Sequence, residues 1–335
     1  MTLPITRRSA LAGLASLGLA ATWPLRAQAA DMATPGWPVK PITYVVPFTP
    51  GGSTDVIGRA LSQKLSDSLG QPVVVDNKPG AAGAVGASYV AKAKADGYTL
   101  FGGTISTHAI NASLYKNLSY DPVKDFEPVA LVAMLPNVLI VDPHLGINSV
   151  AELVALLKRD PSKRYFASSG AGTSTHLAGE MFADLIGVPL THVAYKGTPP
   201  AMMDVVAGQV PLMFDQMTAA ISLVQAGKLK LLAVTTGKRI ALAPQLPTMI
   251  ESGIAQFEMS SWQAVYAPKG TPRPIVQRLN SDIVKILKMP DVVAKLHDQL
   301  GMEIIASTPD ELASHMKSEI ARWAALVKKS GATAS

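Results

Sequence analysis

The first structural unit of this chain is indicated by the stretch Val46-Pro47-Phe48-Thr49-Pro50-Gly51-Gly52-Ser53-Thr54-Asp55. The β-branched run over residues 42–48 predicts a strand that stops at the Pro-Gly turn. Ser53 or Thr54 can then cap a helix, whose apolar residues recur on one face until Gly70 ends it. A strand that turns directly into a helix is one unit of an α/β sheet.

The same order of strand and helix continues along the chain. Strands at 73–75 and 98–101 flank a helix at 83–94. After Asp142-Pro143 the pattern restarts, with helices predicted at 150–158, 174–186 and 199–207 and strands at 165–167, 192–194, 211–214 and 230–234. This alternation predicts parallel β-α-β units in an open sheet, whose ligand crevice lies at the carboxyl ends of the strands.

Two lobes fit the length of 335 residues better than one large domain. We expect residues 38–141 and 265–335 to form lobe 1, and residues 142–264 to form lobe 2. The chain then crosses between the lobes near Val141 and near Ser261, so the lobes can hinge around a shared cleft.

The first 30 residues have the features of an export signal. Arg7-Arg8 precedes an apolar, uncharged run at 9–22, and Ala27-Gln28-Ala29 supplies the small residues that a signal peptidase reads. The run is shorter than the roughly 20 residues that cross a bilayer. We expect cleavage near Ala29 or Ala30 and a periplasmic mature protein. The arginine pair indicates the twin-arginine route, but Ala10 replaces the usual large apolar residue, so the general secretory route stays open.

Composition excludes several classes of protein. The formal charge of +6 comes from 30 basic and 24 acidic residues, and removal of the signal leaves 27 basic residues. That balance does not favour a nucleic-acid partner. The chain has no Cys, which excludes thiolate nucleophiles, zinc–cysteine sites and disulfides.

Turns rich in Gly, Ser and Thr stand before the predicted helices. They lie at 49–55, 102–108, 168–174 and 195–198. Each can be an ordinary helix cap. Taken together, two in each predicted lobe, they favour an anion cradle, because unpaired N–H groups at a helix start carry partial positive charge and hydroxyls add donors. A carboxylate fits such a cradle.

Enzymatic and metal-binding alternatives have weaker signals. The chain lacks a Gly-x-Ser-x-Gly elbow, a phosphate loop and a complete dinucleotide fingerprint. His176 and Glu180 are four residues apart on one predicted helix, a spacing more typical of a surface contact than of a metal site. We therefore expect no enzyme activity, no cofactor and no metal. Asp215, at a strand end, can either accept a hydrogen bond from the ligand or brace its loop.

At these turns the chain resembles the Bug family, the substrate-binding proteins of tripartite tricarboxylate transporters. The motifs that carry the resemblance are the opening stretch with Arg59, residues 75–83 (VDNKPGAAG), residues 168–173 (SSGAGT) with His176 and Leu177, Tyr195-Lys196-Gly197, and residues 227–235 (GKLKLLAVT). The resemblance covers nearly all of the mature chain. It implies the type II periplasmic-binding-protein fold, two α/β lobes with a cleft between them that close on a carboxylate.

The resemblance also implies which residues hold the ligand. One wall comprises Phe48, Thr49, Gly51, Gly52, Ser53 and Thr54, and the facing wall comprises Ser168, Ser169, Gly172 and Thr173. Thr104, Ser106, Thr107 and His108 flank the pocket, and Asp215 lies toward the distal end. In the family, ordered waters and few charged side chains hold the carboxylate. Thr49, and Met217-Thr218 after Asp215, depart from the usual family pattern, and the second departure leaves the identity of the ligand open.

The predicted function is capture of a small carboxylate, either a dicarboxylate or tricarboxylate, an acidic amino acid or an aromatic acid. The expected partners are this ligand and the membrane subunits of a tripartite transporter, and the expected state is a monomer. A ligand sensor that signals to a membrane histidine kinase is the alternative, since both would use the same pocket.

Overall fold

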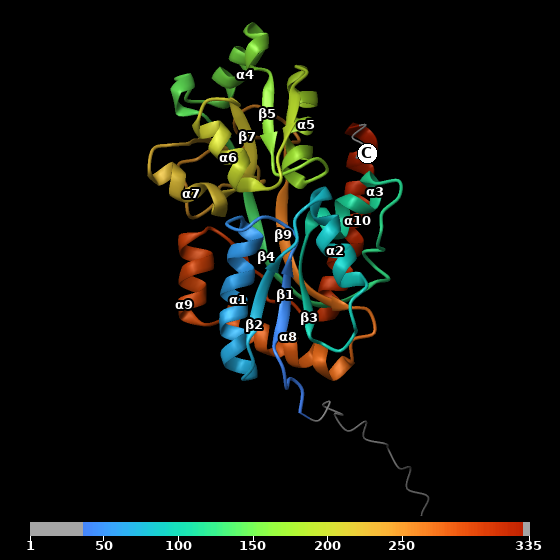
Figure 1. The fold of residues 1–335 in the computed structure, drawn as a ribbon. Helices are drawn as coiled ribbons and strands as arrows, with labels where there is room; N and C mark the ends of the chain where they lie inside the picture. The colour runs from blue at the N-terminus through green and yellow to red at the C-terminus, as the bar shows by residue number, and fades with distance from the viewer. Residues whose placement is uncertain (1–35, 331–335) are drawn as a thin grey trace, which may run out of the picture.

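The structure is a computed structural model that describes residues 36–330, so the predicted signal peptide lies outside the described residues. Two α/β lobes are stacked one above the other, and strands run between them (Figure 1). This arrangement confirms the predicted fold class. Within the described residues no helix is both long and apolar enough to span a membrane.

Lobe 1 is built on a sheet that begins with three parallel strands. Strand β1 (Ile42–Val46) lies between β2 (Val73–Asn77) and β3 (Thr99–Thr104). Strand β1 is almost wholly buried, which explains its continuous run of β-branched residues. Helices on both sides cover the sheet: α1 (Ser53–Leu69), α2 (Ala84–Ala91), α3 (Asn111–Leu114), α8 (Arg273–Leu287), α9 (Pro290–Val293) and α10 (Pro309–Ser330).

Two antiparallel strands connect the lobes. Strand β4 (Phe126–Val141) pairs with β9 (Ser260–Pro268) from Phe126 to Pro136, in lobe 1. From Asn137 onward, β4 pairs instead with strands of lobe 2. The expectation of parallel β-α-β units therefore fails at β4 and β9, which are antiparallel to each other and to their other neighbours. The short strand β10 (Glu303–Ile304) also pairs with β4.

Lobe 2 has a smaller sheet around the far half of β4. Its other strands are β5 (Tyr165–Ser168), β6 (Thr191–Ala194), β7 (Leu212–Gln216) and β8 (Lys230–Val234). Its helices are α4 (Val150–Arg159), α5 (Ser174–Ile186), α6 (Thr198–Val206) and α7 (Met217–Gln225). Strand β5 is parallel to β6 and β7, as the alternation of elements predicts.

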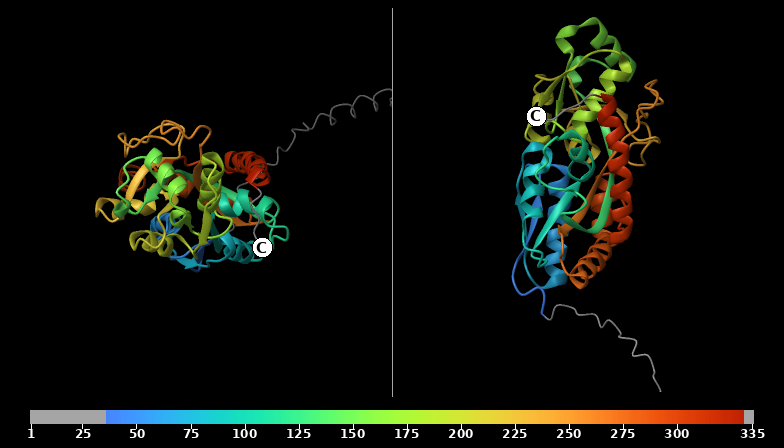
Figure 2. Two further views of the ribbon diagram at one scale, coloured as in Figure 1. Left: turned by 90° about the horizontal axis from the view of Figure 1, so that it is seen from above. Right: turned by 90° about the vertical axis from the view of Figure 1, so that its right-hand side faces the viewer.

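Helix α10 runs along the molecule from lobe 1 to the side of lobe 2, as the right-hand view of Figure 2 shows. The buried carboxylate of Glu319 anchors it, because Oε2 accepts hydrogen bonds from the indole nitrogens of Trp262 (3.0 Å) and Trp323 (3.1 Å). One apolar cluster extends through both lobes and includes Phe101 of lobe 1 and Phe214 of lobe 2. The lobes thus share a continuous core beside the strands that connect them.

The lobe boundaries at residues 141 and 264 remain predictions, and the strand pairing changes close to them. Pairing along β4 changes at Pro136 and Asn137, and pairing along β9 begins at Ser260, so both changes lie a few residues before the predicted limits of 141 and 264. Short helical turns complete the described chain, among them a π-helical turn at Ser106–Ile110 directly after β3.

Candidate functional site

A small cavity of about 40 Å³ lies between the lobes. Lobe 1 contributes Phe48, Thr49, Gly52, Ser53, Thr54, Thr104, Ile105 and Ser106, lobe 2 contributes Ser169, Ser174, Thr198 and Gln216, and β9 contributes Ser261, Trp262 and Gln263. A space of this size holds a few water molecules. A longer ligand therefore enters only if the lobes move apart.

Four helices begin at this cavity. Ser53 starts α1, Ser174 starts α5, Thr198 starts α6, and Gln216 is the N-cap of α7. The N-terminus of a helix carries a partial positive charge and unpaired N–H groups. The cavity is therefore suited to an anion, and in the described chain none of the side chains lining it carries a charge.

The first turn of α1 offers uncapped donors. Its N-cap, Gly52, makes no capping contact through a side chain, and its first intrahelical bond runs from the N–H of Val56 to the carbonyl of Gly52. The N–H groups of Ser53 and Thr54 precede that bond and have no recorded acceptor in residues 36–330. Free N–H groups at a helix start suit an anion.

Asp55 holds the turn before α1 in shape. Its Oδ2 accepts hydrogen bonds from the N–H of Gly51 (3.0 Å) and Nε of Arg59 (2.9 Å), and its Oδ1 accepts one from Nδ2 of Asn77 (3.0 Å). Burial alone would raise the pKa of Asp55, but these bonds outweigh burial and lower it. Arg59 is thus paired with Asp55 on α1 and with Asn77, and it does not line the cavity.

The loop between β5 and α5 differs from the predicted cradle because its backbone N–H groups are already hydrogen-bonded. Its N–H groups at Ser169, Gly170, Gly172 and Thr173 all donate to atoms of the same loop or of the first turn of α5. Its remaining polar contribution to the cavity comes from Ser169 and Ser174. The loop therefore acts as a fixed wall that presents side-chain hydroxyls.

Hydrogen bonds between the lobes cross the cavity. Oγ of Ser53 donates to Oε1 of Gln216 (3.4 Å), and the N–H of Ser174 donates to Oγ of Ser106 (3.3 Å). Ser261 on β9 accepts from Nε2 of Gln216 (3.1 Å) and contacts Oγ of Ser174 (3.2 Å). These contacts show the lobes in a closed arrangement.

Asp215 lies behind the cavity rather than on its wall. It is fully buried, its Oδ2 accepts a hydrogen bond from Oγ1 of Thr198 (2.7 Å), and its Oδ1 accepts one from the N–H of Gln216 (2.7 Å). Burial raises its pKa from 3.8 to about 7, and these two bonds only partly oppose the rise. In this arrangement Asp215 braces two residues that line the cavity.

Asp215→Asn is expected to stabilise the protein at pH 8 but not at pH 4. The native state holds the Asp215 proton more tightly than the unfolded state, so wild-type stability falls as the pH rises from about 4 to about 7. The loss corresponds to on the order of 2–4 kcal/mol. Thermal unfolding across this pH range measures it, with Asp67→Asn on the exposed face of α1 as control. A stability difference that is the same at every pH would contradict the assignment.

The predicted site residues divide into two groups. Those that line the cavity are Phe48, Thr49, Gly52, Ser53, Thr54, Thr104, Ser106 and Ser169. Those that lie behind it or beside it are Gly51, Thr107, His108, Ser168, Gly172, Thr173 and Asp215. Ligand contact by either group stays a prediction.

His108 belongs to the core of lobe 1. It is fully buried, stacks on Tyr266 with ring centroids 3.8 Å apart, and contacts Oγ1 of Thr107 through Nδ1 (2.9 Å). Burial lowers its pKa to about 3, so its ring is neutral. It supports the π-helical turn that carries Ser106.

Sequence reasoning did not select Ile105, Ser174, Thr198, Gln216, Ser261, Trp262 or Gln263 as site residues. Ser174 and Thr198 lie within the predicted hydroxyl-rich turns, and Gln216 directly follows Asp215, so local turn chemistry was a usable signal for them. The residues on β9 gave a weaker signal, which was the presence of Ser260, Ser261 and Gln263 in a strand whose other residues are mostly apolar.

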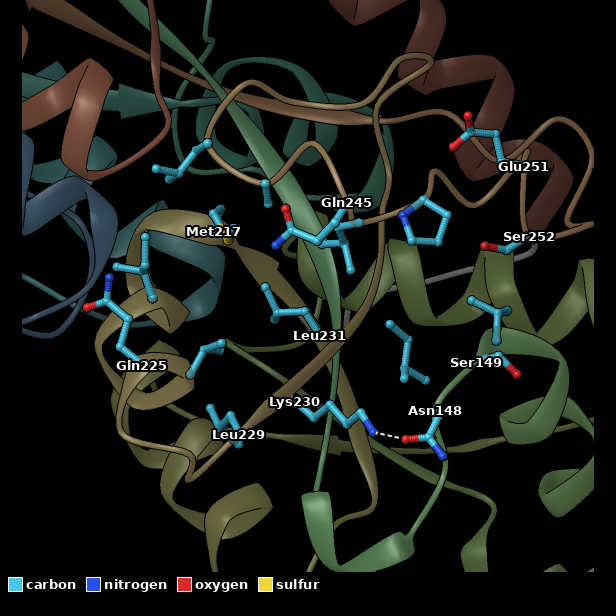
Figure 3. Close-up of a pocket in the computed structure, with 18 of the residues that line it drawn as sticks. Asn148, Ser149, Met217, Gln225, Leu229, Lys230, Leu231, Gln245, Glu251 and Ser252 are labelled. Atoms are coloured by element: carbon cyan, nitrogen blue, oxygen red, sulfur yellow. Dashed lines mark hydrogen bonds between the residues drawn. The ribbon is translucent and has the colours of Figure 1, made fainter.

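A wider groove of about 690 Å³ lies on lobe 2 alone (Figure 3). Its walls are mostly apolar and come from α7, β8 and residues 242–252. At one end the Lys230 ammonium donates a hydrogen bond to Oδ1 of Asn148. The smaller cavity is the better candidate site, because both lobes and four helix starts meet there.

The described residues contain no group of three or more potential metal-ligating side chains. His176 and Glu180 contact each other at 3.3 Å on α5, as their spacing predicts.

The chain matches a family of known sequences and resembles individual relatives. The sequence model of the family described as "Tripartite tricarboxylate transporter family receptor" matches residues 57–332. Protein BugT of Bordetella pertussis is 39% identical over 305 residues, which cover 91% of this chain and 93% of BugT.

Solved structures resemble the whole fold. The R. palustris protein Rpa4515 with adipate is 40% identical with a TM-score of 0.86, over 89% of this chain and 99% of that chain. MatC from Rhodopseudomonas palustris with bound malate is 34% identical with a TM-score of 0.83, over 87% of this chain and 100% of that chain.

Proposed function

Because the chain belongs to the tripartite tricarboxylate transporter receptor family, we propose that it is a periplasmic receptor that captures a small carboxylate for uptake. The observation that carries the proposal is the uncharged cavity at which α1, α5, α6 and α7 begin. Helix starts attract an anion, and hydroxyls complete its coordination without a cationic side chain. Adipate in Rpa4515 and malate in MatC support a carboxylate ligand.

The proposed capture proceeds by closure of the lobes. With the lobes apart, the ligand's carboxylate reaches the N–H groups and hydroxyls of Ser53 and Thr54 on lobe 1. Lobe 2 then closes over it with Ser169 and Thr198. Closure removes water from the cavity, which strengthens the attraction between the anion and the helix starts. Binding and release in this scheme involve no chemical change in the ligand, so we propose a binding protein and not an enzyme.

The same proposal covers export and assembly. The mature protein begins after cleavage near Ala29 or Ala30, acts in the periplasm as a monomer, and delivers its ligand to the membrane subunits of a tripartite transporter. The lobes are residues 38–141 with 265–335, and residues 142–264. Deletion of the gene should abolish uptake of the labelled ligand, whereas a sensor would leave uptake by an already expressed transporter intact.

A thermal-shift panel of carboxylates tests the proposal on the mature protein. At about 100 times its dissociation constant, a ligand adds about 2.7 kcal/mol to the free energy of unfolding. We expect malate, succinate, adipate, citrate, glutamate, benzoate or a related acid to raise the melting temperature, and we expect neutral sugars to leave it unchanged. The proposal fails if no carboxylate acts and a sugar or a metal ion does.

A further inference from the structure

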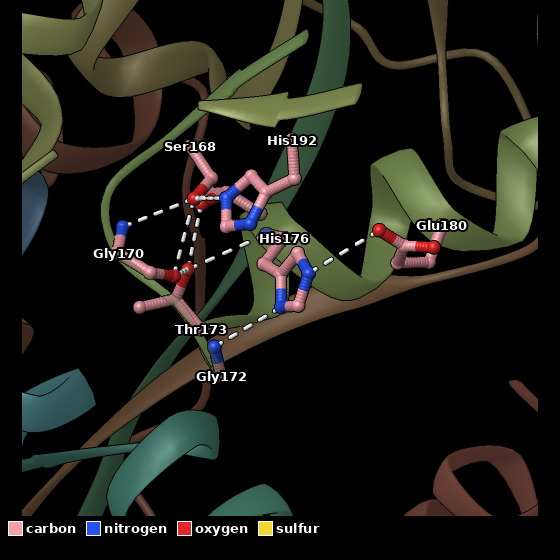
Figure 4. A network of polar contacts seen from close by, with 8 residues as sticks. Ser168, Gly170, Gly172, Thr173, His176, Glu180 and His192 are labelled. Carbon is pink, nitrogen blue, oxygen red and sulfur yellow. Dashed lines mark hydrogen bonds and ion pairs between the residues drawn. The ribbon is translucent and has the colours of Figure 1, made fainter. Parts of the chain in front are cut away.

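Two histidines lie directly behind the loop that forms the lobe 2 wall of the cavity (Figure 4). His176 is in the first turn of α5, and His192 is on β6. Their rings stack with centroids 3.9 Å apart, and neither ring lines the cavity. The proposed function gives neither histidine a role.

His176 is bonded to the loop through both its ring and its backbone. Its Nδ1 accepts a hydrogen bond from the N–H of Gly172 (3.1 Å), and its own N–H donates to Oγ1 of Thr173 (3.3 Å). Because Nδ1 acts as the acceptor, it carries no proton, and the N–H group of the ring is at Nε2. Nε2 lies 3.3 Å from Oε1 of Glu180, to which it donates. Glu180 thereby fixes the tautomer that can bind Gly172.

The protonation states of Glu180 and His192, the two side chains beside His176, favour these hydrogen bonds. The hydrogen bond from His176 lowers the pKa of Glu180, so its carboxylate stays ionised as an acceptor. Burial lowers the pKa of His192 to about 4. His192 is therefore neutral near pH 7, and its Nε2 bonds Oγ of Ser168 (2.6 Å) at the start of the same loop.

Gly172 is where this network meets the opposite lobe. Its φ of +83° is one that side chains rarely adopt, and a Cβ added there would lie 2.3 Å from Cδ2 of Leu114 in lobe 1. The loop backbone at Gly172 therefore packs closely against lobe 1 when the lobes are closed. A small displacement of Gly172 would move Ser169 and Ser174 and disturb the contact between the lobes.

We propose that His176 is a positioning residue for carboxylate binding: its Nδ1 lone pair, oriented by Glu180, holds Gly172 so that the loop matches both the anion and the opposite lobe. The inference rests on the proposed function, because it concerns the same cavity. It predicts that the acceptor at Nδ1, and not the imidazole ring itself, is the required feature.

Two substitutions separate these features. His176→Leu removes the acceptor and keeps a comparable apolar volume. His176→Asn places Oδ1 where Nδ1 stands and so keeps the acceptor. His144→Leu is the matched control, since the His144 side chain is 83% exposed and contacts Asp142 away from the cavity.

The experiment measures adipate affinity by calorimetry and the hydrogen-exchange rate of the Gly172 amide by NMR without ligand, in all four mature proteins. We expect His176→Leu to weaken adipate binding at least tenfold and to accelerate exchange at Gly172 at least tenfold. His176→Asn should return both values to within about threefold of wild type, and His144→Leu should change neither. In wild type, ¹⁵N shifts should show a protonated Nε2 and an unprotonated Nδ1 at His176.

The inference is wrong if His176→Leu leaves Gly172 exchange unchanged, or if His176→Asn is as impaired as His176→Leu. If wild type does not bind adipate, the exchange rates and the ¹⁵N shifts still decide whether His176 holds the loop. The carboxylate panel then decides the proposed function separately.

Discussion

Ser169→Tyr is expected to abolish carboxylate binding while the protein stays folded. Ser169 lines the cavity between the lobes, and that cavity measures about 40 Å³. A phenol ring at this position takes the space that the carboxylate needs and prevents lobe 2 from closing over it. The side chain is only partly buried, so the larger ring can turn toward the open cleft without disrupting the core of lobe 2.

The measurement is calorimetric titration with whichever carboxylate shifts the melting temperature most. We expect the dissociation constant to rise more than 100-fold, with the circular dichroism spectrum unchanged. Ser162→Tyr, at an exposed position in the same lobe, should bind as wild type does. Wild-type affinity in Ser169→Tyr would remove the β5–α5 loop from the site.

Gly197→Ala is expected to hold the lobes apart. Gly197 is the N-cap of α6 with φ +135°, and a Cβ added there would lie 2.1 Å from Oγ1 of Thr49 in lobe 1. Part of the effect is backbone strain within lobe 2, roughly 1–3 kcal/mol, because φ 135° with ψ 173° is a conformation that essentially only glycine adopts. The larger part arises only when the lobes close, so we expect affinity to fall about 100-fold or more.

Two further variants separate collision from strain. Gly187→Ala also forces a side chain into positive φ, at +64°, but its Cβ would meet nothing within 4 Å, so it should leave affinity unchanged. Thr49→Gly removes the opposing side chain, and the double variant with Gly197→Ala should bind more tightly than Gly197→Ala alone. X-ray scattering with saturating ligand should show Gly197→Ala in an open form. Compaction like that of wild type would contradict this account of closure.

Much of the fold could be predicted from local patterns. The run of Ile, Val and Tyr in β1, followed by the Gly-Gly turn and α1, predicted a strand and a helix that the structure contains. Strand β4 could not be read in this way. It is buried along most of its length, so it lacks alternation, and Pro128 and Pro136 within it argue against a strand. Only the pairing with β9 and the lobe 2 strands makes it one continuous element.

The site was predictable where its chemistry is local. Ser53, Thr54 and Ser169 stand at strand-to-helix turns, and such turns meet at one edge of an α/β sheet. Ser261 and Gln263 reach the cavity only because β9 crosses between the lobes beside β4, which depends on the order of strands. Burial of Asp215 and His108 is likewise a tertiary property, since a hydroxyl-rich motif does not reveal which of its neighbours faces inward.

The role of the loop backbone also required the structure. The Gly-rich sequence at 168–173 predicts free N–H donors, yet these groups bond within the loop and to His176. Uncapped donors are instead at helix starts such as that of α1, where Gly52 provides no capping side chain. Both walls were expected to donate backbone N–H groups, and we now expect only the lobe 1 wall to do so, while the loop at 168–173 offers hydroxyls.

A crystal structure of the mature protein with the carboxylate that gives the largest thermal shift is the most direct test of the central claim. We predict that one carboxylate of the ligand lies between the lobes, with its oxygens within about 3 Å of the N–H or hydroxyl groups of Ser53 and Thr54. We predict that no Lys or Arg contacts it. A ligand in the groove beside Lys230, or a carboxylate paired with a cationic side chain, would contradict the claim.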